Sequence, residues 1–162
     1  MPRCDVHPGV EKVVAAGAER GLAVEPEEHA AGSRTAQDAA AAIGCPLGAI
    51  VKSLVFRVDH EVVVALVSGT NTLDEEALAR AAGGREAGRV DAGTVREATG
   101  FPVGGVPPFG HRSELRVFVD EDLLAFDRVH AAAGTPATTF GVAPADLVAA
   151  TGGVVAPLAR RP

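Results

Sequence analysis

The most constraining feature of the sequence is a pair of apolar runs separated by two residues. The first run is "AIVKSLVFRV" (residues 49–58), the second is "EVVVALV" (residues 61–67), and "DH" joins them. Apolar side chains at both odd and even positions predict strands that are covered on both faces. A two-residue connection predicts a tight antiparallel hairpin. The chain must therefore fold around a buried hairpin.

Short helical and extended segments alternate irregularly around the hairpin. Helical spacing, capping residues and closing glycines predict helices within residues 7–21, 35–44, 72–84, 91–100 and 143–153, with Thr35 and Thr72 as N-caps and a helical turn at 121–126. Strand patterns occupy residues 22–25, 115–120, 128–134, 138–143 and 154–159. No repeat or linker interrupts the chain, so we expect one domain, residues 1–162, of α+β class with a mixed, curled sheet and surrounding helices.

Composition excludes several classes of protein. The chain has 162 residues, of which 47% are hydrophobic, which is typical of a globular domain. No apolar run approaches the roughly 20 residues that span a bilayer, and the N-terminus lacks the apolar core of a signal peptide, so we expect a cytoplasmic protein with no membrane partner. The net charge of −6 argues against wrapping along a nucleic-acid duplex, but contact with the end of a nucleic acid needs few phosphate contacts.

Common catalytic and metal-binding patterns are absent from the sequence. Cys4 and Cys45 form no CxxC pair, and the five histidines show neither HxxxH nor HExxH spacing. No GxSxG elbow and no glycine-rich phosphate loop appears. A metal site or a Ser-His-Asp triad could still assemble in space from distant residues, but no spacing in the sequence indicates either, and we expect no metal and no cofactor.

Lys52 is the first candidate for chemistry. It is one of two lysines in a chain whose other basic residues are arginines, and it shares a strand face with Ile50, Leu54, Phe56 and Val58. A lysine among apolar neighbours either extends its charge to water at a sheet edge or is held by a partner. Because the run is apolar on both faces, an edge is disfavoured, and a compact ammonium group can direct one charge at one oxygen.

The second candidate is the loop "FPVGGVPPFG" (residues 101–110), in which three glycines and three prolines fall within ten residues. Prolines fix the backbone and glycines let another molecule approach it, so the loop is either a shaped structural turn or a donor of backbone N–H groups to an oxygen. His111 follows it, as a solvated surface residue or a catalytic one. Gly134 and Ser68 lie in further turns between predicted strands.

Four segments together resemble one known family. They are "TAQDAAAAIGCPLGAIVKSLVF", "VSGTNTLDEEALARAAGG", "EATGFPVGGVPPFG" and "AAAGTPATTFGVAPADLVAATGG". In this order they closely resemble the YbaK-like aminoacyl-tRNA deacylases, which are related to the editing domain of bacterial prolyl-tRNA synthetases. The resemblance implies a barrel-like α+β domain that hydrolyses the ester of a mischarged tRNA, with a proline tRNA carrying cysteine or alanine as the expected substrate.

The resemblance also implies site residues. The family's essential lysine aligns with Lys52, its GxxxP loop with Gly104, Gly105, Val106, Pro107 and Pro108, and its later glycine with Gly134. Ala133 stands where family members often have serine. Lys52 would position the terminal adenosine or stabilise an oxyanion, while backbone N–H groups hold the carbonyl and water or a substrate thiol attacks. Ser68 and His111 complete the expected substrate contacts.

The expected partners are the acceptor end of aminoacyl-tRNA and prolyl-tRNA synthetase. A competing interpretation is a binding module that holds an aminoacyl-tRNA or nucleotide without turnover and accompanies a synthetase.

Overall fold

The predicted hairpin is present and lies at the centre of a five-stranded sheet. The structure is a computed structural model that describes residues 7–29 and 35–160, so Cys4 lies outside it. Strand β2 (Val51–Val58) pairs with β3 (Glu61–Ser68) in antiparallel register, and the turn between them has the two residues that the sequence predicted.

The five-stranded sheet is mixed, as expected. Its strand order is β4-β2-β3-β5-β8, in which β4 spans Ala87–Arg89, β5 spans Arg116–Asp120 and β8 spans Val154–Ala156. Strand β2 is antiparallel to both of its neighbours, whereas β5 runs parallel to β3 and to β8. Strand β4 was not predicted, because it is three residues long and lies in a glycine-rich segment without alternation.

A second sheet of three antiparallel strands stands beside the first. Its order is β1 (Glu27–Glu28), β7 (Thr138–Val142) and β6 (Val129–Ala132), and the strand expected at residues 22–25 is not formed. The two sheets meet at one isolated bridge, between Ile50 and His130. The expectation of a curled, barrel-like sheet is therefore wrong. A barrel needs a closed hydrogen-bond ladder, and the short edge strands β4 and β8 are not joined to each other.

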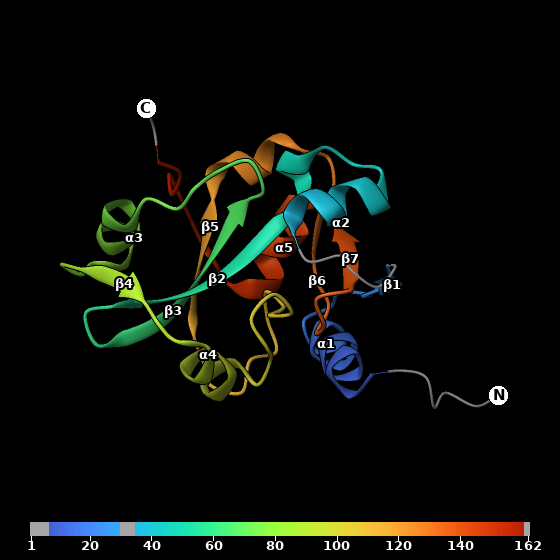
Figure 1. Ribbon diagram of the computed structural model, residues 1–162, viewed down its shortest axis with the longest axis horizontal. Coiled ribbons are helices and arrows are strands. Elements are labelled where there is room, and N and C mark those ends of the chain that lie inside the picture. Colours follow the sequence, from blue (N-terminus) through green and yellow to red (C-terminus); the bar gives the residue numbers. More distant parts are fainter. Residues whose placement is uncertain (1–6, 30–34, 161–162) are drawn as a thin grey trace.

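Within residues 7–29 and 35–160, five α-helices surround the sheets (Figure 1). They are α1 (Pro8–Glu19), α2 (Ala36–Ile43), α3 (Glu75–Ala82), α4 (Ala92–Thr99) and α5 (Pro144–Thr151), with 3₁₀ turns η1 (Leu47–Ala49) and η2 (Glu121–Ala125). Thr35 caps α2 as predicted, by accepting a hydrogen bond from Asp38 N–H. No helix within the described residues is long and apolar enough to cross a membrane.

Helix α3 begins two residues later than predicted. Its N-cap is Asp74, whose carboxylate accepts from Ala77 N–H at 3.2 Å, and not Thr72. The later start of the helix is caused by contacts with the C-terminal segment. The carbonyl of Thr72 accepts from Arg160 N–H, and Leu73 bridges Ala159, so this stretch is extended before the helix starts.

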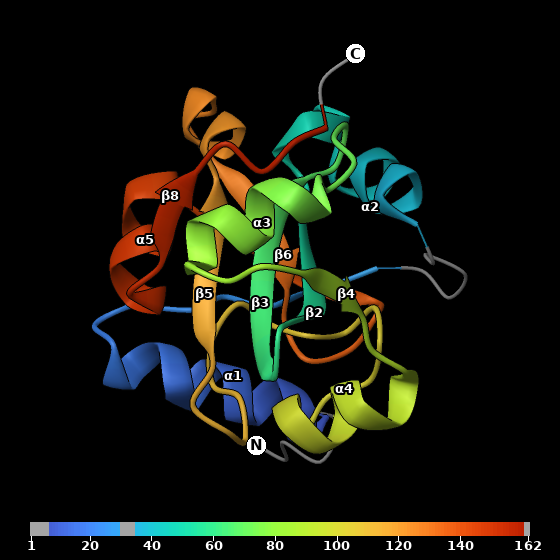
Figure 2. The same ribbon diagram turned by 90° about the vertical axis from the view of Figure 1, so that its left-hand side faces the viewer.

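Two apolar clusters cover the two faces of the five-stranded sheet, as its apolar runs predicted. One face contributes Val51, Val55, Val64, Leu66, Val117 and Val119 to the larger cluster. The other contributes Phe56, Val58, Val63, Ala65, Val67 and Phe118, which pack with Leu78 and Ala79 of α3. Figure 2 shows α3 lying across this second face, over β3. The hairpin is thus buried on both faces.

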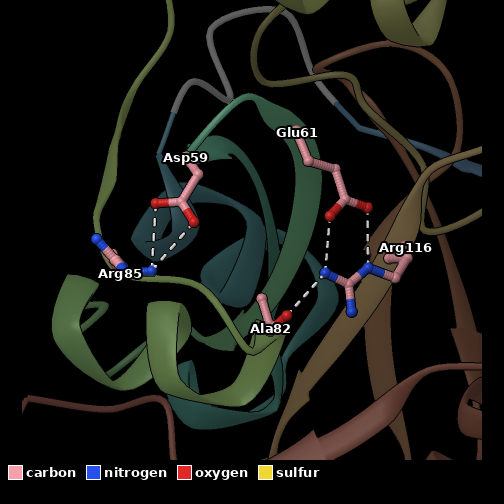
Figure 3. Close-up of polar contacts among 5 residues, drawn as sticks. All are labelled: Asp59, Glu61, Ala82, Arg85 and Arg116. Atoms are coloured by element: carbon pink, nitrogen blue, oxygen red, sulfur yellow. Dashed lines mark hydrogen bonds and ion pairs between the residues drawn. The ribbon is translucent and has the colours of Figure 1, made fainter.

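Polar contacts fix the turn end of the hairpin, which is the end away from Lys52 (Figure 3). The carboxylate of Asp59 accepts hydrogen bonds from Arg85 N–H, which attaches the segment before β4. Arg116 of β5 forms an ion pair with Glu61 of β3 at 2.7 Å and also donates to the carbonyl of Ala82. These contacts tie the β2–β3 turn, the segment before β4 and strand β5 together at one end of the sheet. Lys52 lies at the opposite end.

Candidate functional site

The segment of β2 around Lys52 forms an open edge. Strand β4 pairs only with Phe56–Val58, and the pairing with β6 on this side is a single isolated bridge at Ile50, although β6 packs near β2. Within the described residues, no strand pairs with Val51–Val55 on the side opposite β3. The expectation that Lys52 avoids an edge is therefore wrong. Burial of both faces of a strand says nothing about its two edges.

The open edge presents the main chain of Ser53. Gly69 N–H donates to the carbonyl of Ile50 at 2.8 Å, so the backbone groups of Ile50 point toward β3. Backbone groups alternate in direction along a strand. Those of Ser53, three residues further, therefore point away from β3 and toward the open edge.

Two hollows flank this edge. The larger has a volume of about 440 Å³ and the smaller about 270 Å³. Six residues line both hollows, three from β2 and three from the glycine-proline loop: Lys52, Ser53, Leu54, Val103, Gly104 and Val106. The lysine strand and the first part of the loop therefore face each other across one divided cavity.

The ammonium group of Lys52 is held by a hydrogen-bond network. Its Nζ donates to the main-chain carbonyl of Asn71 at 2.5 Å. The side-chain amide of Asn71 donates in turn to Asp120 and Asp122, each at 2.8 Å. Partial burial lowers the pKa of Lys52, and the negative charge of Asp120 opposes this effect.

The larger hollow has a basic lining. Besides Lys52 it is lined by Arg89 at the end of β4 and by Arg160, both exposed, and by one acid, Glu75. In a chain of net charge −6, three cations against one carboxylate make a locally positive hollow. Such a hollow suits a phosphate or another anion.

The smaller hollow has walls of small side chains. The N-cap residue Thr35 and the α2 residues Ala36 and Ala39 contribute to them, and the second sheet contributes His130, Ala132, Thr138 and Thr139. Two buried side-chain atoms at this hollow, Ser53 Oγ and His130 Nδ1, have no hydrogen-bond partner within the described residues. Burial lowers the pKa of His130, and the charge of Arg128 lowers it further.

The two predicted glycine turns touch each other. Gly104 has φ of 88°, a conformation that favours glycine. At Gly105 an added Cβ would lie 3.0 Å from backbone atoms of Thr135, so the loops are in contact. The N–H of Gly105 already donates to the carbonyl of Pro102 at 2.9 Å and is not available to a ligand.

Gly134 faces helix α1. It has φ of 105°, and a Cβ there would lie 2.6 Å from the backbone of Gly9. Its neighbour Pro136, and not Gly134 itself, lines the smaller hollow.

The remaining predicted residues lie elsewhere. Ser68 is buried, donates from Oγ to the carbonyl of Gly48 at 2.6 Å, and lines neither hollow. Pro107 is buried, and its carbonyl accepts from His111 Nε2 at 2.7 Å. Pro108 and His111 line a third hollow of about 410 Å³. The described residues contain no group of three acidic, histidine or cysteine side chains placed to bind a metal.

The model of the aminoacyl-tRNA editing domain family matches residues 30–150 of the chain. The chain belongs to this family. The match includes the hairpin, the glycine-proline loop and Gly134. The editing-domain assignment thus agrees with the resemblance found in the sequence.

Individual editing-domain relatives agree with this assignment. YwhH, an uncharacterized protein of Bacillus subtilis, is 32% identical over 115 residues, covering 71% of this chain and 73% of that protein. A proline–tRNA ligase of Maridesulfovibrio salexigens is 38% identical over 93 residues, which are 57% of this chain but 16% of the ligase. A crystal structure described as a candidate trans-editing enzyme for prolyl-tRNA synthetase superposes with a TM-score of 0.92 and 42% identity, covering 97% of this chain and 100% of that one.

Sequence reasoning missed three residues of this editing-domain cavity. Ser53 follows Lys52 directly. Because side chains alternate between the two faces of a strand, the sequence placed Ser53 on the face opposite Lys52, and it was not considered as a site residue. Arg89 lies on the unpredicted strand β4. His130 carried no spacing signal, because its relation to Lys52 depends on the bridge between the two sheets.

Proposed function

We propose that this chain is a deacylase that hydrolyses the ester bond of mischarged tRNA, with a proline tRNA carrying a small amino acid, cysteine or alanine, as substrate. One observation carries the proposal: Lys52, on an open strand edge, lines both hollows together with Gly104. Membership of the editing-domain family supports it. The whole chain, residues 1–162, acts as one domain, and its partners are the acceptor end of the tRNA and prolyl-tRNA synthetase.

The two hollows divide the substrate between them. The larger one, lined by Lys52, Arg89 and Arg160, takes the terminal adenosine and its phosphate. The smaller one, of about 270 Å³, takes the aminoacyl group, because the alanine and threonine side chains on its wall leave space for an amino-acid side chain. The ester carbonyl then lies where the hollows join, beside Lys52 and the outward-facing N–H of Ser53.

The chemistry is an attack by water on the ester carbonyl carbon. The C=O electrons move onto oxygen, and the resulting oxyanion is stabilised by the Lys52 charge and by backbone N–H groups of Ser53 and Gly104. The carbonyl group then re-forms and the bond to the ribose oxygen breaks. A vicinal ribose hydroxyl relays the proton lost by the attacking water to this ribose oxygen, giving free amino acid and uncharged tRNA. No protein nucleophile is assigned. Positioning and fixed charges supply the rate.

A deacylation assay tests this function. The purified chain is incubated with proline tRNA charged with alanine, cysteine or proline, and release of the amino acid is followed. Lys52→Ala is expected to reduce kcat/KM for the mischarged tRNA by about 100-fold or more, as loss of an oxyanion partner does elsewhere. Lys12→Ala, which changes the other lysine, on the exposed side of α1, is the matched control and keeps full activity.

Two outcomes would contradict the proposal. Equal turnover by the wild type and Lys52→Ala would remove Lys52 from the mechanism. Tight binding of charged tRNA without release of any amino acid would instead establish a binding module.

A further inference from the structure

Asn71 links Lys52 to two carboxylates that differ in burial. The main-chain carbonyl of Asn71 accepts from Lys52 Nζ, and its side-chain nitrogen donates to Asp120 and to Asp122, at 2.8 Å in each case. Asp120, the last residue of β5, is 0% exposed, whereas Asp122 in η2 is partly exposed. One residue therefore joins the ammonium group to a fully buried carboxylate and to a partly exposed one.

The hydrogen bonds of Asp120 are those of an ionised carboxylate. Within the described part of the chain, its oxygens accept from three N–H donors: Ser68 N–H at 3.2 Å, Asn71 Nδ2 at 2.8 Å and Asp122 N–H at 3.1 Å. An ionised carboxylate can only accept, so three donors satisfy it without a proton of its own. A buried negative charge nevertheless costs free energy unless a positive charge lies near it.

Lys52 supplies this positive charge. Partial burial lowers the pKa of Lys52, and the negative charge of Asp120 raises it. The two groups act on each other across Asn71, whose carbonyl contacts the ammonium group and whose amide contacts the carboxylate. Each charge therefore stabilises the other.

The other charged or titratable side chains around Lys52 are more exposed or do not have a negative charge. The larger hollow has the exposed cations and one partly exposed acid, and the smaller hollow has a buried imidazole: Arg89, Arg160, Glu75 and His130. Salt and water screen exposed charges, whereas a buried charge is screened much less. The buried carboxylate of Asp120 is therefore the acid with the largest effect on Lys52.

We propose that Asp120 is a positioning residue of the editing site, which holds Lys52 in place through Asn71 and keeps it as a charged ammonium ion. The inference rests on the deacylase function above and specifies the state in which Lys52 acts. Asp120 lines neither hollow beside Lys52, so it does not touch the substrate. A charged Lys52 has no lone pair, so it is an electrostatic partner of the oxyanion and not a general base.

An NMR titration tests the charge of Lys52 directly, because the chain has only one other lysine, Lys12. Lysine labelled with ¹³C at Cε gives two signals, which Lys12→Ala assigns. Asp120→Asn removes the charge and keeps one oxygen acceptor. We expect it to lower the titration midpoint of Lys52 by about one pH unit or more, as loss of a nearby opposite charge does. The signal of Lys12, on the exposed side of α1, is the internal control.

Asp122→Asn is the matched control variant. The same nitrogen of Asn71 donates to Asp122 at the same distance, and the substitution removes a charge of the same sign from a partly exposed position. We expect the midpoint of Lys52 to move by less than about 0.3 pH units, because water screens this charge. Equal shifts in the two variants, or no shift in Asp120→Asn, would overturn the proposal.

The pH profile of deacylation shows whether this charge matters to the reaction. After subtraction of spontaneous ester hydrolysis, kcat/KM should fall on the alkaline side of the profile, and Asp120→Asn should move this fall to lower pH by as much as the NMR midpoint. A reduced rate with an unmoved alkaline limb would make Asp120 a structural residue only and would overturn the proposal.

The NMR titration needs no turnover, so it separates this inference from the deacylase function. A shifted Lys52 midpoint without deacylation of any charged tRNA would overturn the deacylase and leave the pairing of Asp120 with Lys52 standing. Turnover without a shifted midpoint would overturn the inference alone.

The wild type carries the test if circular dichroism shows that Asp120→Asn does not fold. In about 1 M salt, exposed charges are screened and a buried one much less. We expect the midpoint of Lys52 not to fall when salt is added. A fall would assign its counter-charge to exposed carboxylates and would contradict the role of Asp120.

Discussion

The side chain of Lys52 and the main chain of Asn71 are joined by a hydrogen bond of 2.5 Å, across 19 residues of sequence. The acceptor carbonyl belongs to a residue whose own side chain is clamped between Asp120 and Asp122. The position of the ammonium group therefore depends on a loop that is itself fixed from the far end of β5. Asn71 is a positioning residue in this arrangement.

Asn71→Ala is expected to reduce kcat/KM of deacylation by about tenfold, because the loop carbonyl is no longer held opposite Lys52. Loss of a donor to buried Asp120 should also lower the free energy of unfolding by about 1–3 kcal/mol. Thr70→Ala, at an exposed position of the same loop, is the control. Kinetics and urea unfolding measure the two effects, and reduced stability with unchanged kcat/KM would limit Asn71 to a structural role.

Gly105→Ala should disturb the contact between the two glycine turns. Its Cβ would lie 3.0 Å from backbone atoms of Thr135, which cannot move as a flexible side chain would. We expect a loss of about 1–3 kcal/mol in unfolding free energy, as for other overpacked sites, and a fall in activity as Gly104 shifts. Gly93→Ala, where the nearest atom lies 3.5 Å away, is the matched control and should be neutral or slightly stabilising. Full activity in Gly105→Ala would show that the loop contact does not shape the site.

Glu61→Gln removes the ion pair with Arg116 but is expected to cost less than about 1 kcal/mol, because both side chains are about half exposed to water. The effect should shrink further in about 1 M salt, where the Debye length is only about 3 Å. Thermal unfolding at low and high salt measures it, with Glu86→Gln as the exposed control. A larger cost that is insensitive to salt would mean that the carboxylate acts through something other than charge.

Stability should fall in mild acid. Burial lowers the pKa of His111 below its usual 6.5, so the unfolded chain takes up a proton at a higher pH than the folded one. The contribution of this group is therefore complete above pH 6.5 and is lost as the pH falls toward the lower pKa of the folded state. His111→Gln should flatten this part of the curve of unfolding free energy against pH, whereas His60→Gln serves as the exposed control. An unchanged slope would place the titration elsewhere.

The sequence predicted what depends on neighbouring residues. The period of the apolar runs gave the hairpin and the face of Lys52, and Thr35 gave the start of α2. Features that depend on segments distant in the sequence were not predicted. Asp74 replaced Thr72 as a cap because the C-terminal segment holds Thr72 extended, and β4 is too short to show a pattern. The open edge and the proximity of His130 to β2 follow from how two sheets meet, which no local pattern records.

The unpaired stretch of β2 has a consequence for how the sequence of such a protein can evolve. A backbone amide at residue 53 survives almost any side-chain replacement, so this contact to the reacting carbonyl, unlike the one from the Lys52 side chain, would be insensitive to mutation. The walls contributed by α2 and by the second sheet are built from side chains and can vary freely. A new amino acid could thus be accepted by altering those walls alone, with the chemistry left in place.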